Sequence, residues 1–402
     1  MCGDTWRSWD VTFCTCQESV TFLVWPREEG ELDDRSRDFP GRTVQCLLPQ
    51  HEAAQKCQRY CLVTNDDGPC SEDESPFIYS FSELLIAEFL GSERSKLKVV
   101  IPDSQASWIG KSYLIKNKLT VVDYDPSTRT KSTDPSSTGP TALPDNPWKL
   151  VSGTPASCSN LGLFNLFPSQ IDLVISGPNY GRNTSSAFSL SSGTVGAAMD
   201  AALSNHRAIA LSYGIFERPI SDGLLKAANQ LAVKIIRELW KTGFGQPGDP
   251  NYPDLYSVNI PLVPAILNEP KVMWTTESRT RYARLFLPAT DGSKSEPTQP
   301  AEIDEAASHL QDLHSNDPCG SNPKISKPLH GPLEFVFKPD ISALIDPNAP
   351  GLLEGSDAWA LNRGFATVTP LCAAFKPAPR PPIPDPTQSA STTDHGDSVW
   401  KL

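Results

Sequence analysis

Two adjacent carboxylates, Asp66 and Asp67, stand in the segment LVTNDDGPC, where a short apolar run ends. Neighbouring carboxylates repel each other unless a cation or a proton lies between them. Hard divalent cations prefer oxygen ligands such as carboxylates, hydroxyls, amide carbonyls and water. The pair therefore suits a metal site, although Asp-Asp-Gly is also good turn chemistry, and the residues alone leave both interpretations open.

Polar side chains follow two further apolar runs. PDSQASW, at 102–108, contains Ser107, and SGPNYGRN, at 176–183, contains Asn179. Because ligands of open α/β sheets bind at the carboxyl ends of the strands, sheet geometry would bring the three segments together. Taken singly, Ser107 or Asn179 is more often an ordinary loop residue. The combination predicts an all-oxygen metal site formed by Asp66, Asp67, Ser107 and Asn179.

A helix start is predicted in SSGTVGAAMD, where Ser192 and Thr194 flank Gly193. Free N–H groups and the positive dipole end at a helix N-terminus can hold a phosphate. A serine that simply caps its helix is the alternative. Beside a metal site, a hydroxyl-lined anion cradle favours metal-assisted phosphoryl chemistry.

The elements that would position these residues alternate in type. Continuously apolar strands are predicted at 60–64, 96–102, 171–176, 207–212 and 255–261. Helices are predicted at 75–91, 191–206 and 222–240, and a Ser/Thr/Pro-rich loop at 124–147. Apolar strands that alternate with helices indicate a mostly parallel sheet covered on both faces. We therefore expect an α/β, doubly wound, three-layer fold, followed after residue 265 by β-rich segments.

The domain organisation follows from composition. Residues 1–57 have no clear period and are expected to form a poorly ordered appendage, while 58–375 form the α/β domain with a polar insert at 287–331. The Pro/Ser/Thr/Asp-rich segment 376–402 is expected to be a disordered tail.

Charge and composition exclude several classes of protein. The 402 residues carry a formal net charge of -12 and include ten cysteines. An acidic chain of this kind is not expected to bind a nucleic-acid polymer, which needs clustered cations. No transmembrane run or secretory signal is recognisable, so we expect no membrane association and a cytoplasmic location, with free thiols in place of disulfides.

Six segments, in order, resemble the survival protein SurE family of metal-dependent nucleotidases and phosphatases. LVTNDDG, VVIPDSQAS, GTPASC, SGPNYGRN and SSGTVGAAMDAAL are similar to the family's motifs, and SDAWALNRGFATVTPL to its closing segment. The resemblance covers about 59–375. It implies a SurE-like α/β/α fold with a β-hairpin and C-terminal extension used in dimerisation, and hence a homodimer or tetramer.

The resemblance also implies a site. It assigns Asp66, Asp67, Ser107 and Asn179 to a Mg²⁺ or Mn²⁺ ion, and places around the phosphate Asn65, Asn183, Ser192, Gly193 and Thr194. The implied substrates are small phosphate monoesters, typically nucleoside 5′- and 3′-monophosphates. Two departures stand out. Trp108 replaces a small family residue, and its ring could stack on a base or pack on its own loop. Ser157 precedes Cys158 where the family commonly has Asp-Cys.

The hypothesis for mechanism is metal-assisted hydrolysis, with Asp66 or Asp67 as general base. Two alternatives remain: a broad acid phosphatase or polyphosphatase without nucleotide preference, and a catalytically weak binding protein. A haloacid-dehalogenase-type site needs D-x-D spacing, which the adjacent aspartates do not provide.

Overall fold

The computed structural model describes residues 59–69, 77–132, 146–245, 249, 251–289, 334–349 and 352–375. The predicted appendage at 1–57 and tail at 376–402 lie outside these ranges, as does nearly all of the insert predicted at 287–331. The division of the chain into these parts therefore stays a prediction.

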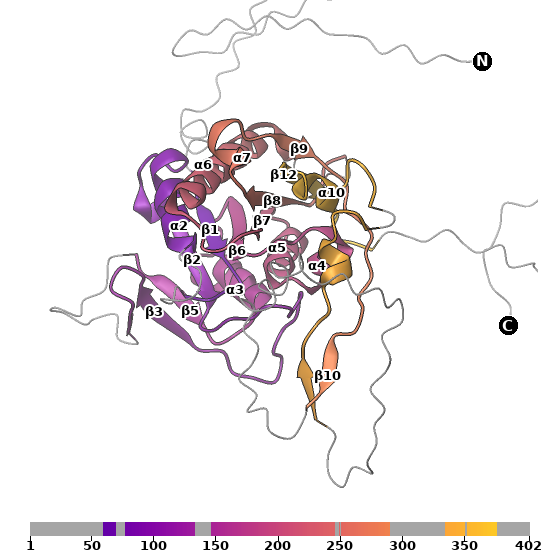
Figure 1. Cartoon of the computed structure of the whole chain (residues 1–402). Helices are drawn as coiled ribbons and strands as arrows, with labels where there is room; N and C mark the ends of the chain where they lie inside the picture. Colours follow the sequence, from indigo (N-terminus) through magenta and orange to yellow (C-terminus); the bar gives the residue numbers. More distant parts are fainter. Residues whose placement is uncertain are drawn as a thin grey trace, which may run out of the picture. The chain divides into compact units, whose positions relative to one another are not determined.

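A ten-stranded sheet forms the centre of the described domain, in the order β4-β3-β5-β2-β1-β6-β7-β8-β12-β9 (Figure 1). Six neighbouring strands, β5 to β8 in that order, are parallel. Strand β3 runs antiparallel to β5, and β12 runs antiparallel to β8 but parallel to β9. The strands are β1 (Cys61–Thr64), β2 (Leu97–Pro102), β3 (Val121–Asp125), β4 (Thr130–Ser132), β5 (Trp148–Val151), β6 (Leu173–Tyr180), β7 (Arg207–Ile215), β8 (Leu255–Leu262), β9 (Val272–Trp274) and β12 (Ala366–Leu371).

Helices cover both faces of the sheet. The helices are α2 (Phe77–Glu88), α3 (Pro155–Leu161), α4 (Ser185–Ser191), α5 (Gly193–Leu203), α6 (Asp222–Glu238), α7 (Ala265–Asn268), α9 (Ser342–Ile345) and α10 (Asp357–Leu361). A separate antiparallel hairpin pairs β10 (Phe286–Pro288) with β11 (Phe335–Phe337). The expected doubly wound fold with a hairpin is confirmed.

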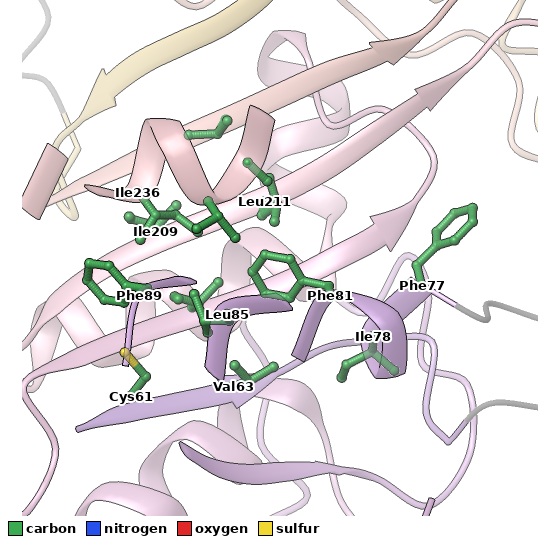
Figure 2. Close-up of a cluster of buried hydrophobic side chains, with 14 of the residues drawn as sticks. Cys61, Val63, Phe77, Ile78, Phe81, Leu85, Phe89, Ile209, Leu211 and Ile236 are labelled. Carbon is green, nitrogen blue, oxygen red and sulfur yellow. The ribbon is translucent and has the colours of Figure 1, made fainter. Parts of the chain in front are cut away.

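The side-chain alternation of strand β1 explains the three layers. Cys61 and Val63 point to one face, where they join a buried cluster with Phe81 and Leu85 of α2 and Ile236 of α6 (Figure 2). Leu62 points to the other face, into a cluster with side chains of α3 and α5. Because successive residues of a strand face opposite sides, a strand buried on both faces must be apolar throughout.

The order of the strands fixes where a ligand can bind. The chain passes from β1 to β2 on one side and later returns to place β6 on the other side of β1. In open α/β sheets, ligands bind beyond the carboxyl ends of the strands at such a reversal. Asp66 and Asp67 follow β1, and Asn179 lies near the end of β6, so the strands on both sides of the reversal carry predicted site residues.

The prediction of a loop over 124–147 is partly wrong. Strand β3 extends into this range as far as Asp125, and β4 (Thr130–Ser132) lies within it. At the edge of the sheet, β4 pairs antiparallel with β3, and β3 pairs antiparallel with β5. Most of their side chains are only partly buried, so the apolar pattern that revealed the central strands is absent here.

Candidate metal and phosphate site

A tight turn after β1 carries the acidic pair. The Asn65 side-chain amide donates to the Gly68 carbonyl (2.9 Å), and the Gly68 N–H donates to Asn65 Oδ1 (3.2 Å). Gly68 has a φ of +79°, and a Cβ there would lie 3.1 Å from the backbone carbon of Ser104. Asn65, expected from the resemblance to lie near the phosphate, therefore closes the turn that presents the two aspartates.

The N-terminus of helix α5 faces Asp66. The Thr194 hydroxyl donates to Asp66 Oδ1 (2.5 Å), and the Thr194 N–H donates to Oδ2 (3.0 Å). Gly193 permits this approach, because a Cβ there would lie 2.8 Å from Asp66 Cβ. Burial raises the pKa of the Asp66 carboxyl, and the hydrogen bonds from Thr194 act in the opposite direction. A buried carboxylate is ionised more easily when a cation lies beside it.

Backbone contacts bring the other predicted ligands to the same place. The Tyr180 N–H, next to Asn179, donates to Asp67 Oδ2 (3.0 Å). The Ala106 N–H, next to Ser107, donates to the carbonyl of Asp66 (2.7 Å). The segments of all four predicted metal ligands therefore meet at the carboxyl ends of β1 and β6. Their coordination of a metal stays a prediction.

Ser192 is the N-cap of α5. Its hydroxyl oxygen accepts from the Val195 N–H (3.1 Å), so the capping interpretation holds for this residue. The cap uses an oxygen lone pair, and the hydroxyl proton can still be donated. Gly193 and Thr194 lie against Asp66, so the start of α5 contacts the predicted acidic site.

Asn183 belongs to a buried polar layer that sequence reasoning missed. Its side-chain amide donates to Ser212 Oγ of β7 (2.8 Å), and its N–H donates to Asn259 Oδ1 of β8 (2.7 Å). Asn259 is fully buried. A single asparagine inside the apolar run LYSVNIP was the available signal, since a buried amide must find hydrogen-bond partners.

The donor set fits a hard divalent cation. Among the described residues, no group of three or more histidine, cysteine, aspartate or glutamate side chains could hold a metal ion. The predicted set has two carboxylates, a hydroxyl and an amide. Mg²⁺ and Mn²⁺ suit oxygen ligands, and Mg²⁺ in particular is often held by one or two carboxylates while it keeps several waters.

Trp108 packs on its surroundings beside Ser107. It has a φ of +60°, a conformation that is rare for a bulky residue and costs about 1–3 kcal/mol. Its ring contacts those of Phe188, Tyr282 and Phe337. Of the two interpretations of this residue, the structure shows the packed one, with partners well beyond its own loop.

The second departure, Ser157, lies in the first turn of helix α3. The Thr154 side chain caps this helix by accepting from the Ser157 N–H (3.1 Å), and the two hydroxyls lie 2.9 Å apart. Cys158 is a buried free thiol in the core, as is Cys61. Burial raises the pKa of both thiols, so neither is a ready nucleophile.

Comparisons with known proteins show which proteins this chain is similar to. The model of the family "Survival protein SurE" matches residues 61–284. The chain is 30% identical over 232 residues to "5'-nucleotidase SurE" of Pelobacter propionicus. The matched region covers 58% of this chain and 77% of that protein. It is 36% identical over 246 residues to "Probable tubulin--tyrosine ligase PBY1" of Saccharomyces cerevisiae, covering 56% of this chain and about a third (32%) of the yeast protein.

Among solved structures, the SurE protein from Aquifex aeolicus aligns with a TM-score of 0.49 and 22% identity, over 79% of this chain and 94% of that one. Within the described residues, no helix has the length and apolarity needed to cross a bilayer.

Fold and site together define an open α/β protein with paired carboxylates at its topological switch point. The family match covers more than half of the chain, and the Pelobacter relative is covered over more than two thirds of its length. The chain therefore belongs to the SurE family, as its sequence motifs predicted.

Proposed function

We propose that the protein is a divalent-metal-dependent phosphomonoesterase that hydrolyses nucleoside 5′- and 3′-monophosphates to nucleoside and phosphate. Membership of the SurE family supports hydrolysis of phosphate monoesters, since relatives such as the Pelobacter protein are named 5′-nucleotidases. The observation that carries the proposal is the convergence of Asp66, Asp67 and the start of α5 at the carboxyl ends of β1 and β6.

Asp66, Asp67, Ser107 and Asn179 would hold the Mg²⁺ or Mn²⁺ ion. When bound, the ion supplies charge neutralisation at the phosphoryl group and a lowered pKa for water. The protein's own residues orient the reacting groups and accept or donate protons. Thr194 fixes the Asp66 carboxylate, Ser192 can donate its hydroxyl proton to a phosphate oxygen, and one of the two aspartates accepts the proton of the attacking water.

Phosphate release from AMP, with and without Mn²⁺ or Mg²⁺, tests this proposal. The variant Asp66→Asn/Asp67→Asn should lose metal-dependent release, and the exposed-site control Asp222→Asn should keep it. A panel that includes other phosphomonoesters and polyphosphate separates a nucleotidase from a broad phosphatase. No release from any substrate would overturn the enzyme proposal and leave a binding protein.

The β10–β11 hairpin supports a homodimer or tetramer. Phe286 and Phe335 are 52% and 56% exposed on its two strands, an apolar surface that an isolated hairpin would leave in water. Sedimentation of the full chain and of a Phe286→Ser/Phe335→Ser variant tests this assembly. A monomeric wild type would contradict it.

A further inference from the structure

Trp108 is the meeting point of three aromatic side chains from distant parts of the chain. Its ring centroid lies 5.9 Å from that of Phe188 on α4, 6.1 Å from that of Tyr282 and 5.3 Å from that of Phe337 on β11. The first and third contacts are edge-to-face, a favourable geometry for aromatic pairs. The hairpin strand β11 therefore contacts the residue next to Ser107.

The surroundings of this aromatic cluster are fixed. The Tyr282 hydroxyl donates to the carbonyl of Ala187 (2.5 Å), which ties the segment after β9 to α4. Ala187, Ile341 and Leu344 are buried in the same cluster. Trp108 thus packs against a well-anchored group of side chains.

The backbone on either side of Trp108 is also held. The Ala106 N–H donates to the Asp66 carbonyl, and the Gly110 N–H donates to the Ser191 carbonyl (2.8 Å). Between these two points the chain turns through the left-handed φ of Trp108. Such a conformation persists in a bulky residue only where its surroundings impose it. The ring contacts of Trp108 supply that constraint, and Ser107 lies within the turn.

We propose that Trp108 is a positioning residue that couples the hairpin to the metal site: its packing on Phe337 holds the left-handed turn that presents the Ser107 hydroxyl to the metal. The inference rests on the proposed function, because it presumes a divalent cation at Asp66 and Asp67. Without the ring, the turn relaxes toward negative φ and Ser107 moves away from the two aspartates.

Calorimetric titration of the full chain with Mn²⁺ tests this coupling. Groups that orient metal ligands typically change metal affinity by about 10–100-fold when removed. Trp108→Ala should weaken Mn²⁺ binding by about 10-fold or more, and Trp108→Phe should restore most of it. Phe337→Ala, on the hairpin, should weaken binding in the same direction. The matched control is Phe286→Ala, because Phe286 contacts Phe337 but is not among the rings packed on Trp108.

Wild-type Mn²⁺ affinity in both Trp108→Ala and Phe337→Ala would overturn the coupling. Equal losses in Phe337→Ala and Phe286→Ala would also overturn it, since the effect would then belong to the hairpin as a whole. If Trp108→Ala does not fold, judged by circular dichroism, Phe337→Ala decides. A wild type that binds no Mn²⁺ and releases no phosphate would overturn the proposed function itself, and the coupling with it.

Discussion

Thr194 donates both its hydroxyl and its backbone N–H to Asp66, one to each carboxylate oxygen. The first turn of a helix has unpaired N–H groups and the positive end of the dipole, and here a side chain of the protein occupies that position. Asp66 is 2% exposed and so depends on these donors for its hydrogen bonds. The helix start thus fixes the orientation of a predicted metal ligand.

Removing the Thr194 hydroxyl should therefore weaken metal binding. Thr194→Val keeps the N–H and the shape but deletes one charge-assisted hydrogen bond, worth about 1.5–3 kcal/mol. We expect Mn²⁺ affinity to fall about 10-fold or more, because the pKa of Asp66 rises further and its proton must leave before the metal binds. Titration calorimetry measures this. Thr194→Ser retains the hydroxyl, and an equal loss in both variants would contradict the argument.

Gly193→Ala should disturb the site by steric overlap alone. The new Cβ would lie 2.8 Å from Asp66 Cβ and 2.9 Å from its Oδ2. Overpacking of this kind costs about 1–3 kcal/mol, and the displaced carboxylate should lose both metal binding and phosphate release. In the control Gly223→Ala, on α6, the nearest atom is 4.0 Å away. Urea unfolding should show Gly223→Ala to be neutral or slightly stabilising, and similar behaviour of the two variants would refute the steric argument.

The central strands could be predicted because burial on both faces leaves a continuous apolar run. The runs at β1, β2, β6, β7 and β8 are of this type, and their strand ends located Asp66, Asp67 and Asn179. The edge strands β3 and β4 carry no such signal, because most of their side chains are partly exposed.

Other parts of the site depend on contacts that no local pattern encodes. Helix α4, with the sequence SSAFSLS, has no apolar period, and the Ser185 N–H at its start donates to Asp357, 172 residues away. The direction of Thr194 toward Asp66 likewise follows from packing of α5 on the sheet. Sequence could place Thr194 at a helix start but could not show which anion it faces.

The buried carboxylate of Asp357 should make stability depend on pH. It accepts from the N–H groups of Ser185 (2.8 Å), Ser278 (2.9 Å) and Ala358 (2.7 Å), yet burial raises its pKa. A folded-state pKa above the ordinary value of about 4 means that the folded protein binds more protons than the unfolded chain in the window above that value. The stability from Asp357 is therefore full below pH 4 and is lost as pH rises.

Urea unfolding of wild type and Asp357→Asn between about pH 4 and pH 7 checks this dependence. The variant should be less stable throughout, since an amide cannot accept all three hydrogen bonds. Its deficit in free energy of unfolding should shrink as pH rises, because only the wild type has the titrating group. A deficit that grows with pH would reverse the sign of the argument.

A second buried network offers a test of the fold that is independent of function. The Tyr213 hydroxyl, on β7, donates to Asn229 Oδ1 of α6 (2.6 Å), and the Asn229 amide donates to Ser80 Oγ of α2 (3.0 Å). Tyr213 is fully buried. Tyr213→Phe should cost about 1–3 kcal/mol in free energy of unfolding, because the Asn229 oxygen loses its donor where water cannot replace it. Tyr79→Phe, at a 37% exposed position of α2, should change stability by no more than about 0.5 kcal/mol. Equal small effects in the two variants would mean that water reaches Asn229.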